Sequence, residues 1–334
     1  MRLLIWLILL VPLCWSGWWF FAAHSMQSGL TQWLDDRRAE GWQADVQQMK
    51  LSGFPLALEQ TLIEPALADP DTGVAFTTET IIISAPAWWP GDVTLRFPEE
   101  EVVLASTLER HVIQAQAARA DLRLHPGPTL ELEELALTSG PWSVDTPNGS
   151  TMTAQGLTVR LLQSDDISTA YDIKLEAPAF QPGSVPRRAW RIPQDWPIAF
   201  ESLTLDATVG FDRPLDRATI EEARPQPRRL DLHLAEAAWG ALLVRIAAAL
   251  DVDETGLLSG ELSLQAQNWR DMLSLAETAG ALPPSFRPQL ENILAALARG
   301  SGNPDTIDIT ITLRQGTMYL GFIPLGNAPR LILR

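Results

Sequence analysis

Side chains that could bind a metal ion or act as a general base are few and widely spaced in this sequence. The four histidines are His24, His111, His125 and His233. No His-Glu-x-x-His pattern joins two of them, and the single cysteine, Cys14, offers them no partner. No Gly-x-Ser-x-Gly, glycine-rich phosphate loop or Ser-x-x-Lys pattern occurs either. We therefore predict no catalytic, cofactor-binding or metal-binding residues, and a protein that is not an enzyme.

Acidic side chains do occur in clusters that could act as a general acid and base. Glu99 to Glu101 and Asp165-Asp166 fall where the hydrophobic pattern predicts exposed turns, so we interpret them as solvated turns. The stretch Asp251 to Gly256 resembles the start of an EF-hand calcium loop, with glycine at the sixth position. The twelfth position, however, is Leu262, where that loop needs a bidentate glutamate. We therefore predict an acidic hairpin turn here and no calcium site.

The overall charge excludes one large class of partner. The 334 residues carry a formal net charge of −16, whereas nucleic-acid binding depends on neutralising phosphates with lysine and arginine. Hydrophobic residues make up 46% of the chain, which is too large a share for a disordered tail. The composition thus predicts a folded body that does not bind nucleic acid.

The longest apolar run lies at the amino terminus. Leu3 to Ala23 contain no charged residue and follow Arg2. As a helix this run would be about 30 Å long, which matches the hydrocarbon thickness of a bilayer, and its aromatic end is typical of an interfacial belt. We predict a transmembrane anchor over residues 1–24. Its predicted membrane-contacting side chains are Leu3, Trp6, Trp15, Trp18, Trp19, Phe20 and Phe21.

Two other interpretations of this run stay open. A cleaved signal peptide would end in small residues, whereas this apolar core continues through Phe21. A lipoprotein would use Cys14, but the bulky residues from Val11 to Leu13 precede it in place of a small one. For a retained anchor, Arg2 favours a cytoplasmic amino terminus by the positive-inside rule. We then expect a single-pass protein of the inner membrane whose bulk is periplasmic and free of disulfides.

The hydrophobic period divides the rest of the chain into a stalk and two β-rich halves. Residues 25–41 have a helical period and end at Gly41, which predicts a helical stalk. Residues 42–177 change to a period of two and form the first β-rich half. Prolines crowd residues 178–197, which we interpret as a linker, and residues 198–334 form the second half. The strand-like runs of the first half are 74–84, 93–97, 112–117, 121–124, 130–137, 157–162 and 171–177.

The second half predicts long strands interrupted by helices. Leu242 to Val252 are apolar at every second position, so we expect a strand that turns at 253–256 into a partner strand. Two helical stripes within 268–300 predict a helical hairpin, with Asn268 and Ser285 as N-caps. The predicted fold is therefore mainly β with some α (α+β): a transmembrane helix, an elongated and mostly antiparallel sheet body, and a C-terminal helical hairpin.

Alternation within these strands gives the predicted sheet one apolar face. Its candidate groove-lining residues are Leu242, Val244, Ile246, Ile307, Ile309, Ile311 and Leu313. A row of large aliphatic side chains is stabilised by burial. Either the helical hairpin covers the row from Ile307 to Leu313 or an apolar ligand does, and the sequence leaves both arrangements open.

Three segments resemble a known family. They are GWQADVQQMKLSGFPLALE (Gly41 to Glu59), the run from Trp239 to Trp269, and GTMYLGFIPLGNAPRL (Gly316 to Leu331). In this order they are similar to the bacterial domain-of-unknown-function family 2125, which has no established activity and implies no site residues. The strand–turn–strand of the middle run is also similar to repeats of AsmA-like envelope proteins. That likeness implies a membrane-anchored β-structure associated with lipid transport and outer-membrane maintenance.

Together these observations favour a noncatalytic envelope protein. We expect a membrane-anchored periplasmic protein that shelters or transports lipid on its apolar sheet face, with the bilayer as a partner and without a cofactor. The alternative is a structural or assembly factor that holds another envelope protein on the same face.

Overall fold

The computed structural model describes residues 2–97, 99–107, 109–127, 129–221, 224–280, 282–300 and 303–333, with side chains of the first helix described from Leu10 onward. Strands dominate the chain, and each strand pairing that the structure defines between neighbours is antiparallel, as predicted. The chain forms two compact units. Unit 1 comprises Met1–Pro126 and Leu137–Pro147, and unit 2 comprises Gly127–Ala136 and Asn148–Arg334.

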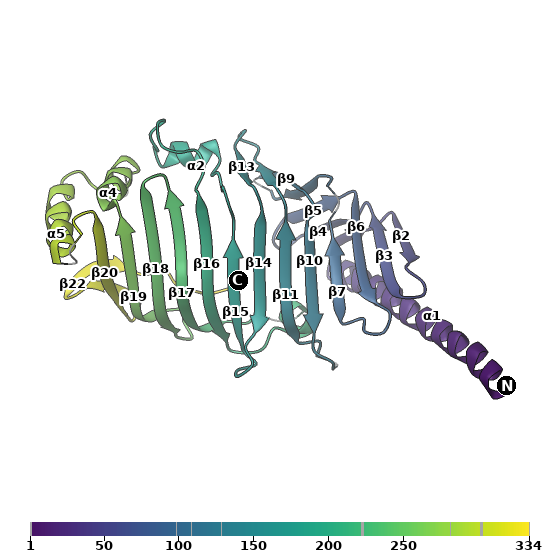
Figure 1. Ribbon diagram of the computed structural model, residues 1–334. Helices are drawn as coiled ribbons and strands as arrows, with labels where there is room; N and C mark the ends of the chain where they lie inside the picture. Colours follow the sequence, from purple (N-terminus) through teal and green to yellow (C-terminus); the bar gives the residue numbers. More distant parts are fainter. Residues whose placement is uncertain are drawn as a thin grey trace. The chain divides into compact units, whose positions relative to one another are not determined.

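Unit 1 combines the first helix with two antiparallel sheets. Helix α1 (Arg2–Ala39) comes first (Figure 1). One sheet orders β2 (Gln48–Ser52), β3 (Ala57–Ile63), β6 (Thr80–Pro86), β7 (Asp92–Arg96) and β10 (Arg119–Leu124). The other orders β1 (Gln43–Asp45), β4 (Ala66–Asp69), β5 (Val74–Thr78), β8 (Val102–Ala105), β9 (Arg110–Ala115) and β12 (Trp142–Asp145). Strand β11 (Leu132–Ser139) carries residues of both units.

Helix α1 joins the predicted anchor and stalk into one helix. Pro12 lies inside it without ending it. The predicted stop at Gly41 is confirmed, because Gly41 has a φ of +93° and the Trp42 N–H donates to the Arg37 carbonyl over 3.0 Å. This bond closes the last turn in the way that C-terminal glycines allow.

The run 74–84 was expected to be one strand, and this prediction is wrong. It forms β5 and β6, which belong to different sheets. The chain turns the corner at Glu79, whose carbonyl accepts a hydrogen bond from the Glu64 N–H over 2.7 Å. The residues on both sides of Glu79 favour strands, so no glycine or proline reveals the corner in the sequence.

Unit 2 is built on consecutive antiparallel strands from β14 to β22, and its first strand, β13, belongs to a different sheet (Figure 1). The strands are β13 (Thr151–Ala154), β14 (Leu157–Gln163), β15 (Ala170–Glu176), β16 (Ser202–Phe211), β17 (Pro227–Trp239), β18 (Leu242–Val252), β19 (Leu258–Gln267), β20 (Thr306–Arg314), β21 (Thr317–Leu320) and β22 (Ile323–Asn327). The predicted strand over 242–252 and its partner are confirmed as β18 and β19. A short helix, α3 (Arg217–Glu221), lies in the connection between β16 and β17.

The proline-rich segment 178–197 lies inside unit 2. It contains α2 (Ser184–Ala189) and connects β15 to β16, which pair directly from Ala170↔Gly210 to Glu176↔Thr204. The two compact units divide at other places, between residues 126 and 148. Gln181 of this connection forms an isolated antiparallel bridge with Thr153 of β13. Prolines therefore do not exclude the whole connection from strand pairing, and they do not determine whether the strands on either side of it pair.

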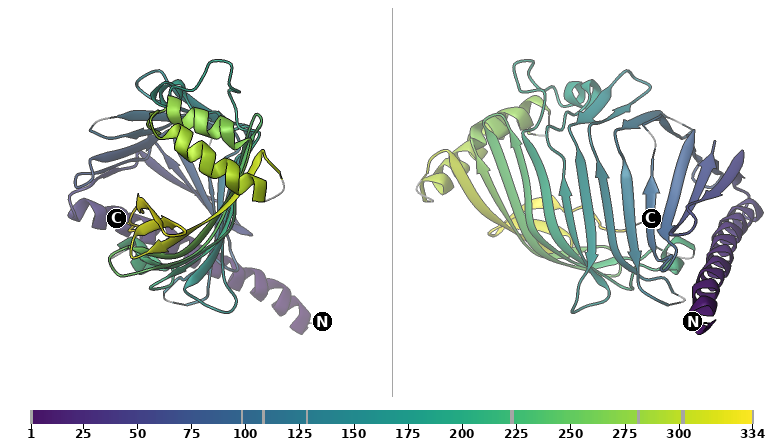
Figure 2. Two further views of the ribbon diagram at one scale, coloured as in Figure 1. Left: turned by 90° about the vertical axis from the view of Figure 1, so that its left-hand side faces the viewer. Right: turned by 45° about the vertical axis from the view of Figure 1, so that its right-hand side comes forward.

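The predicted helical hairpin within 268–300 forms α4 (Trp269–Thr278) and α5 (Arg287–Gly300). Asn268 occupies the predicted N-cap position of α4, but its side chain makes no cap hydrogen bond. Its φ is +56°, and its side-chain amide donates to the Ala241 carbonyl instead. Figure 2 shows α4 and α5 at one end of the strands of unit 2, with β21 and β22 toward the other end.

Candidate functional site

The strand register of unit 2 aligns aliphatic residues across seven strands, β14 to β20. We call these residues the apolar face. Its middle row is Val159, Leu175, Leu205, Ala235, Ile246, Leu264 and Ile309. Its lower row is Leu161, Ile173, Ala207, Leu232, Ala248, Leu262 and Ile311. With about 4.8 Å between neighbouring strands, each row extends for roughly 29 Å.

The opposite face of the same strands is polar. Lys174 pairs with Asp206 across β15 and β16, with 3.3 Å between Nζ and Oδ2. Arg245 pairs with Glu236 across β18 and β17, with 2.8 Å between Nε and Oε2. The sheet is therefore amphipathic, and its apolar side requires a cover.

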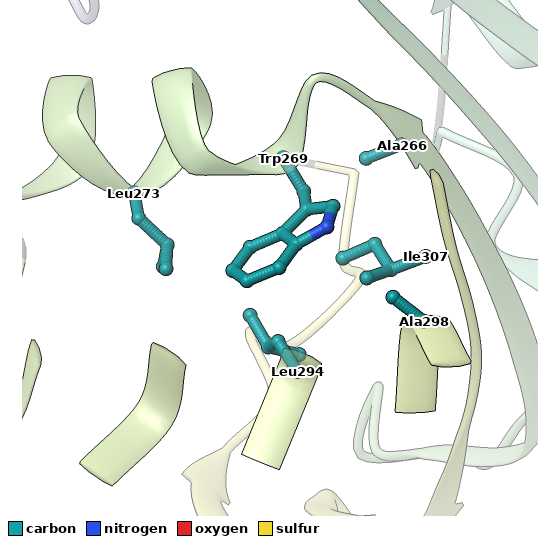
Figure 3. Close-up of a cluster of buried hydrophobic side chains, with 6 residues drawn as sticks. All are labelled: Ala266, Trp269, Leu273, Leu294, Ala298 and Ile307. Carbon is teal, nitrogen blue, oxygen red and sulfur yellow. The ribbon is translucent and has the colours of Figure 1, made fainter. Parts of the chain in front are cut away.

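The helical hairpin covers the upper end of the apolar face. Trp269 and Leu273 of α4 and Leu294 and Ala298 of α5 form a buried cluster with Ala266 and Ile307 of the sheet. Figure 3 shows the Trp269 indole between Leu273 and Leu294 on the helices and Ile307 on the strand. The Trp269 indole N–H donates to the Pro304 carbonyl over 3.0 Å. Because these helix side chains pack on it, Ile307 is 0% exposed.

The carboxyl-terminal segment covers the lower end. Ala328 packs in a buried cluster with Leu250, Val252, Leu258 and Leu313. This segment is held in place by the Leu331 N–H, which donates to the Gly256 carbonyl over 3.0 Å. Leu313 is 4% exposed.

The middle row lies between the two covers. Each of its residues is partly exposed, and among the described residues none of them belongs to a buried cluster. The candidate groove residues thus share one face but not one environment. Leu242, Ile307 and Leu313 are buried, whereas Val244, Ile246, Ile309 and Ile311 are partly exposed.

The sequence did not indicate that β14, β15 and β16 extend this face. The only sequence signal for this extension is that Val159, Leu175 and Leu205 each alternate with polar residues in their own strand. Alternation places a side chain on one side of a strand but does not identify its neighbour on the next strand.

The aromatic segment of α1 contacts residues in or next to β3 and β6 of the same unit. The indole N–H groups of Trp15, Trp18 and Trp19 donate to the carbonyls of Pro55, Ala87 and Ala57 over 2.9, 2.8 and 2.8 Å. Trp19 is 4% exposed and packs with Ala22, Ala23, Leu58 and Ala87. The side chains of Leu3 and Trp6 lie outside the described residues. Within the described part of the chain, no helix has the length and apolar character needed to span a membrane.

Other large apolar side chains around this contact are exposed. We call them the apolar rim: Phe20, Phe21, Phe54, Leu56 and Trp88. Phe54 stacks on Phe20 with 6.2 Å between ring centroids. Trp88 is 63% exposed and follows Ala87, whose carbonyl accepts the Trp18 bond. Clustered exposed apolar side chains of this kind mark sites that contact membranes or other proteins.

The acidic clusters occupy turns and surface positions. A hydrogen bond with the carboxyl group of Glu79 raises the pKa of Glu100, and both residues are exposed. Asp253 accepts hydrogen bonds from the Leu257 N–H and from Thr255, which lower its pKa. Among the described residues, no three side chains of metal-ligating type converge on one point.

A cluster that the sequence analysis missed lies around α2. Arg187, Arg188 and Arg191 line a pocket with a volume of about 410 Å³. The only sequence signal was the Arg-Arg-x-x-Arg spacing inside the proline-rich segment, which the prolines marked as irregular.

Comparison with known proteins extends over both units. No curated protein matches this sequence. One bacterial family, described as "Uncharacterized protein conserved in bacteria (DUF2125)", matches residues 19–329. The match begins at Trp19, the buried tryptophan of α1, and includes every strand of the apolar face. The chain therefore belongs to the DUF2125 family.

Proposed function

We propose that the protein is a noncatalytic, membrane-anchored envelope protein of the periplasm that shelters lipid acyl chains on the apolar face. The observation that carries this proposal is the partly exposed middle row. Full burial stabilises each Leu or Ile side chain by roughly 1.5–3 kcal/mol. The described chain covers both ends of the face but leaves Ile246, Leu264 and Ile309 outside its clusters. A ligand made of hydrocarbon would complete their burial.

The size of the middle row supports an acyl chain as that ligand. Its length of roughly 29 Å is close to the hydrocarbon thickness of a whole bilayer, about 30 Å, which two opposed acyl chains fill. One extended acyl chain has about half that length and therefore fits along the row. The helical hairpin and the carboxyl-terminal segment, which cover the two ends of the strands, would lie on either side of the bound acyl chain.

The amino-terminal region supports attachment to a membrane. The uncharged run that starts at Leu3 continues into the exposed Leu10, Val11 and Leu13. The apolar rim, from Phe20 to Trp88, adds exposed side chains that would enter the interfacial region of a bilayer beside α1. Arg2 favours a cytoplasmic amino terminus and a periplasmic body.

Membrane attachment is testable with a carboxyl-terminal alkaline phosphatase fusion. The fusion is expected to be active and to remain full-length in the membrane fraction. Cys14→Ser is expected to leave attachment unchanged, because the helix and not an acyl chain holds the protein. Recovery of a shortened soluble form would show that the segment is a cleaved signal.

Lipid binding is testable by mass spectrometry of the gently extracted full-length protein. Wild type is expected to retain lipid, and Leu264→Asp to lose it, because a carboxylate in the middle row opposes hydrocarbon burial. Ser263→Asp is the matched control, since Ser263 is exposed on the polar face of the same strand. Absence of lipid from wild type, or equal loss in both variants, would contradict the proposal.

A further inference from the structure

The connection between β15 and β16 folds onto the upper edge of the apolar face. Trp239 lies on that face, because it is two residues from Ala237 and four residues from Ala235 on the same strand, and Ala235 belongs to the middle row. The Arg187 guanidinium lies over the Trp239 ring, 5.7 Å from its centroid. Phe200 stacks on the same ring at 4.5 Å. The connection that bears α2 is therefore fixed on the apolar side of the sheet.

Hydrogen bonds set the position of Arg187 beside this edge. Its Nη1 donates to the Pro197 carbonyl over 2.8 Å, and its Nη2 donates to the Trp196 carbonyl over 3.2 Å. The Trp239 indole N–H donates to the same Pro197 carbonyl over 2.8 Å. Arg187 thus links the α2 pocket directly to the apolar face.

The pocket is basic in a strongly acidic protein. Its volume is about 410 Å³, and its lining residues are Ser184, Arg187, Arg188, Arg191, Ile192 and Gln194. None of these described lining residues is acidic, although the chain has a net charge of −16. A pocket of this size is typical of small-molecule sites.

The arginines of this pocket differ from others in unit 2. Arg229 pairs with Asp231 at 2.7 Å and Arg245 pairs with Glu236 at 2.8 Å. Arg188 and Arg191 are exposed and pair with no carboxylate in the described part of the chain. Arg187 donates to carbonyl groups, which leave its charge uncompensated. The pocket therefore concentrates positive charge that no protein carboxylate neutralises.

Arg191 occupies a backbone position that usually carries glycine. Its φ is +50°, and the Ile192 N–H donates to the Arg187 carbonyl over 2.9 Å to close the end of α2. Glycine is the usual residue at such a left-handed helix end, because a side chain is disfavoured there. Disfavoured backbone conformations of this kind are found most often at functional sites, so the position of Arg191 on the pocket wall favours a functional role for its guanidinium.

We infer that this arginine pocket binds the phosphate of an anionic lipid headgroup. Guanidinium groups bind phosphate oxygens through paired hydrogen bonds. Trp239 lies four residues from Ala235, about 13 Å along the strand, so an amphiphile with its phosphate near Arg187 reaches the middle row with its acyl chains. The inference rests on the proposed function and names its ligand: a lipid with a phosphate-bearing, negatively charged headgroup.

To test this inference, the delipidated full-length protein in detergent is incubated with an equal mixture of phosphatidylglycerol and phosphatidylcholine that have matched acyl chains. Wild type is expected to retain phosphatidylglycerol preferentially. Arg188→Gln combined with Arg191→Gln is expected to reduce this preference by roughly tenfold or more, because the loss of even one charged hydrogen bond has an effect of about that size. Total bound lipid is expected to stay unchanged. The control, Arg299→Gln with Arg314→Gln, makes the same charge change at exposed positions elsewhere in unit 2.

Arg191→Gly separates binding from folding. Glycine suits the left-handed position, so this variant is expected to melt at the wild-type temperature or higher while its preference for phosphatidylglycerol falls. A preference that persists in both Arg191 variants, or equal retention of the two lipids by wild type, would overturn the inference. Retention of neither lipid would contradict the proposed function itself.

A soluble anion is distinguished by titrating glycerol 3-phosphate into the delipidated protein. Binding at least tenfold weaker than that of phosphatidylglycerol is expected, because the acyl chains add burial on the middle row. Equal affinity for the two compounds, unchanged by Leu264→Asp, would assign the pocket to a soluble phosphate and overturn the lipid inference.

Discussion

Ile307 and Ile309 are the same residue type on the same strand and the same face, yet their environments differ. Ile307 is 0% exposed beneath Trp269 and Ala298, whereas Ile309 is partly exposed and outside the clusters of the described chain. The pleat of β20 determines which side both occupy, and the helical hairpin determines which one is covered. The protein thus covers the two ends of its apolar face and leaves the middle row partly exposed.

The largest expected effect is that of Ile307→Asp. An unpaired carboxylate inside the helical-hairpin cluster is expected to lower the free energy of unfolding by about 4 kcal/mol or more. Chemical unfolding of the full-length protein in detergent measures it. Ile307→Val, which removes one methylene, is the control and is expected to cost about 1 kcal/mol. A tolerated aspartate would show that the hairpin does not cover Ile307 in solution.

The lower cover is expected to show an intermediate effect. Leu313→Ala leaves a cavity beneath the carboxyl-terminal segment and is expected to cost about 2–4 kcal/mol. Thermal denaturation of the same preparation checks it. A loss below that of Ile307→Val would show that Ala328 and its neighbours do not pack on Leu313.

Ile309→Asp is expected to have a small effect on stability and a large one on lipid content. Water already reaches this side chain in the empty protein, so the change is expected to cost about 1 kcal/mol or less. Co-purified lipid is expected to be lost. Thr310→Asp, on the exposed polar face of the same strand, should keep it. Destabilisation equal to that of Ile307→Asp would remove the difference between the two isoleucines.

The smallest effect is expected at the β18–β19 turn, beside which the carboxyl-terminal segment is anchored. Hydrogen bonds from the Leu257 N–H and from Thr255 lower the pKa of Asp253 in the folded protein. Its stabilising contribution is therefore complete above the unfolded pKa, about 3.9, and is lost as pH falls through the lower folded value. Asp253→Asn should lower the melting temperature slightly at pH 7. Melting curves of the two proteins should converge in acid, and a constant difference at all pH values would contradict this account.

The sequence predicted local features of the fold well. The alternation from Leu242 to Val252 defined β18, Gly41 marked the end of α1, and the stripes within 268–300 defined the helical hairpin. Each of these signals depends on neighbours in the sequence, and the predicted mainly β, antiparallel class followed from them.

Contacts between distant segments could not be predicted. Periodicity does not specify cross-strand register, so the row that joins Val159 to Ile309 was not visible. An apolar run has the same composition whether lipid or protein surrounds it, so the contact between Trp19 and Leu58 was not predicted either. The prolines around Arg187 indicated an irregular segment, but not that it folds onto Trp239.

The central claim is that the middle row contacts lipid, and photo-crosslinking in native membranes tests it most directly. A photoreactive amino acid is placed at Ile309 in one protein and at Thr310 in another, adjacent positions on opposite faces of β20. The account predicts a lipid adduct at position 309 and none at position 310, detected by mass spectrometry of the intact protein. No lipid adduct at position 309, or an adduct there with another envelope protein alone, would contradict it.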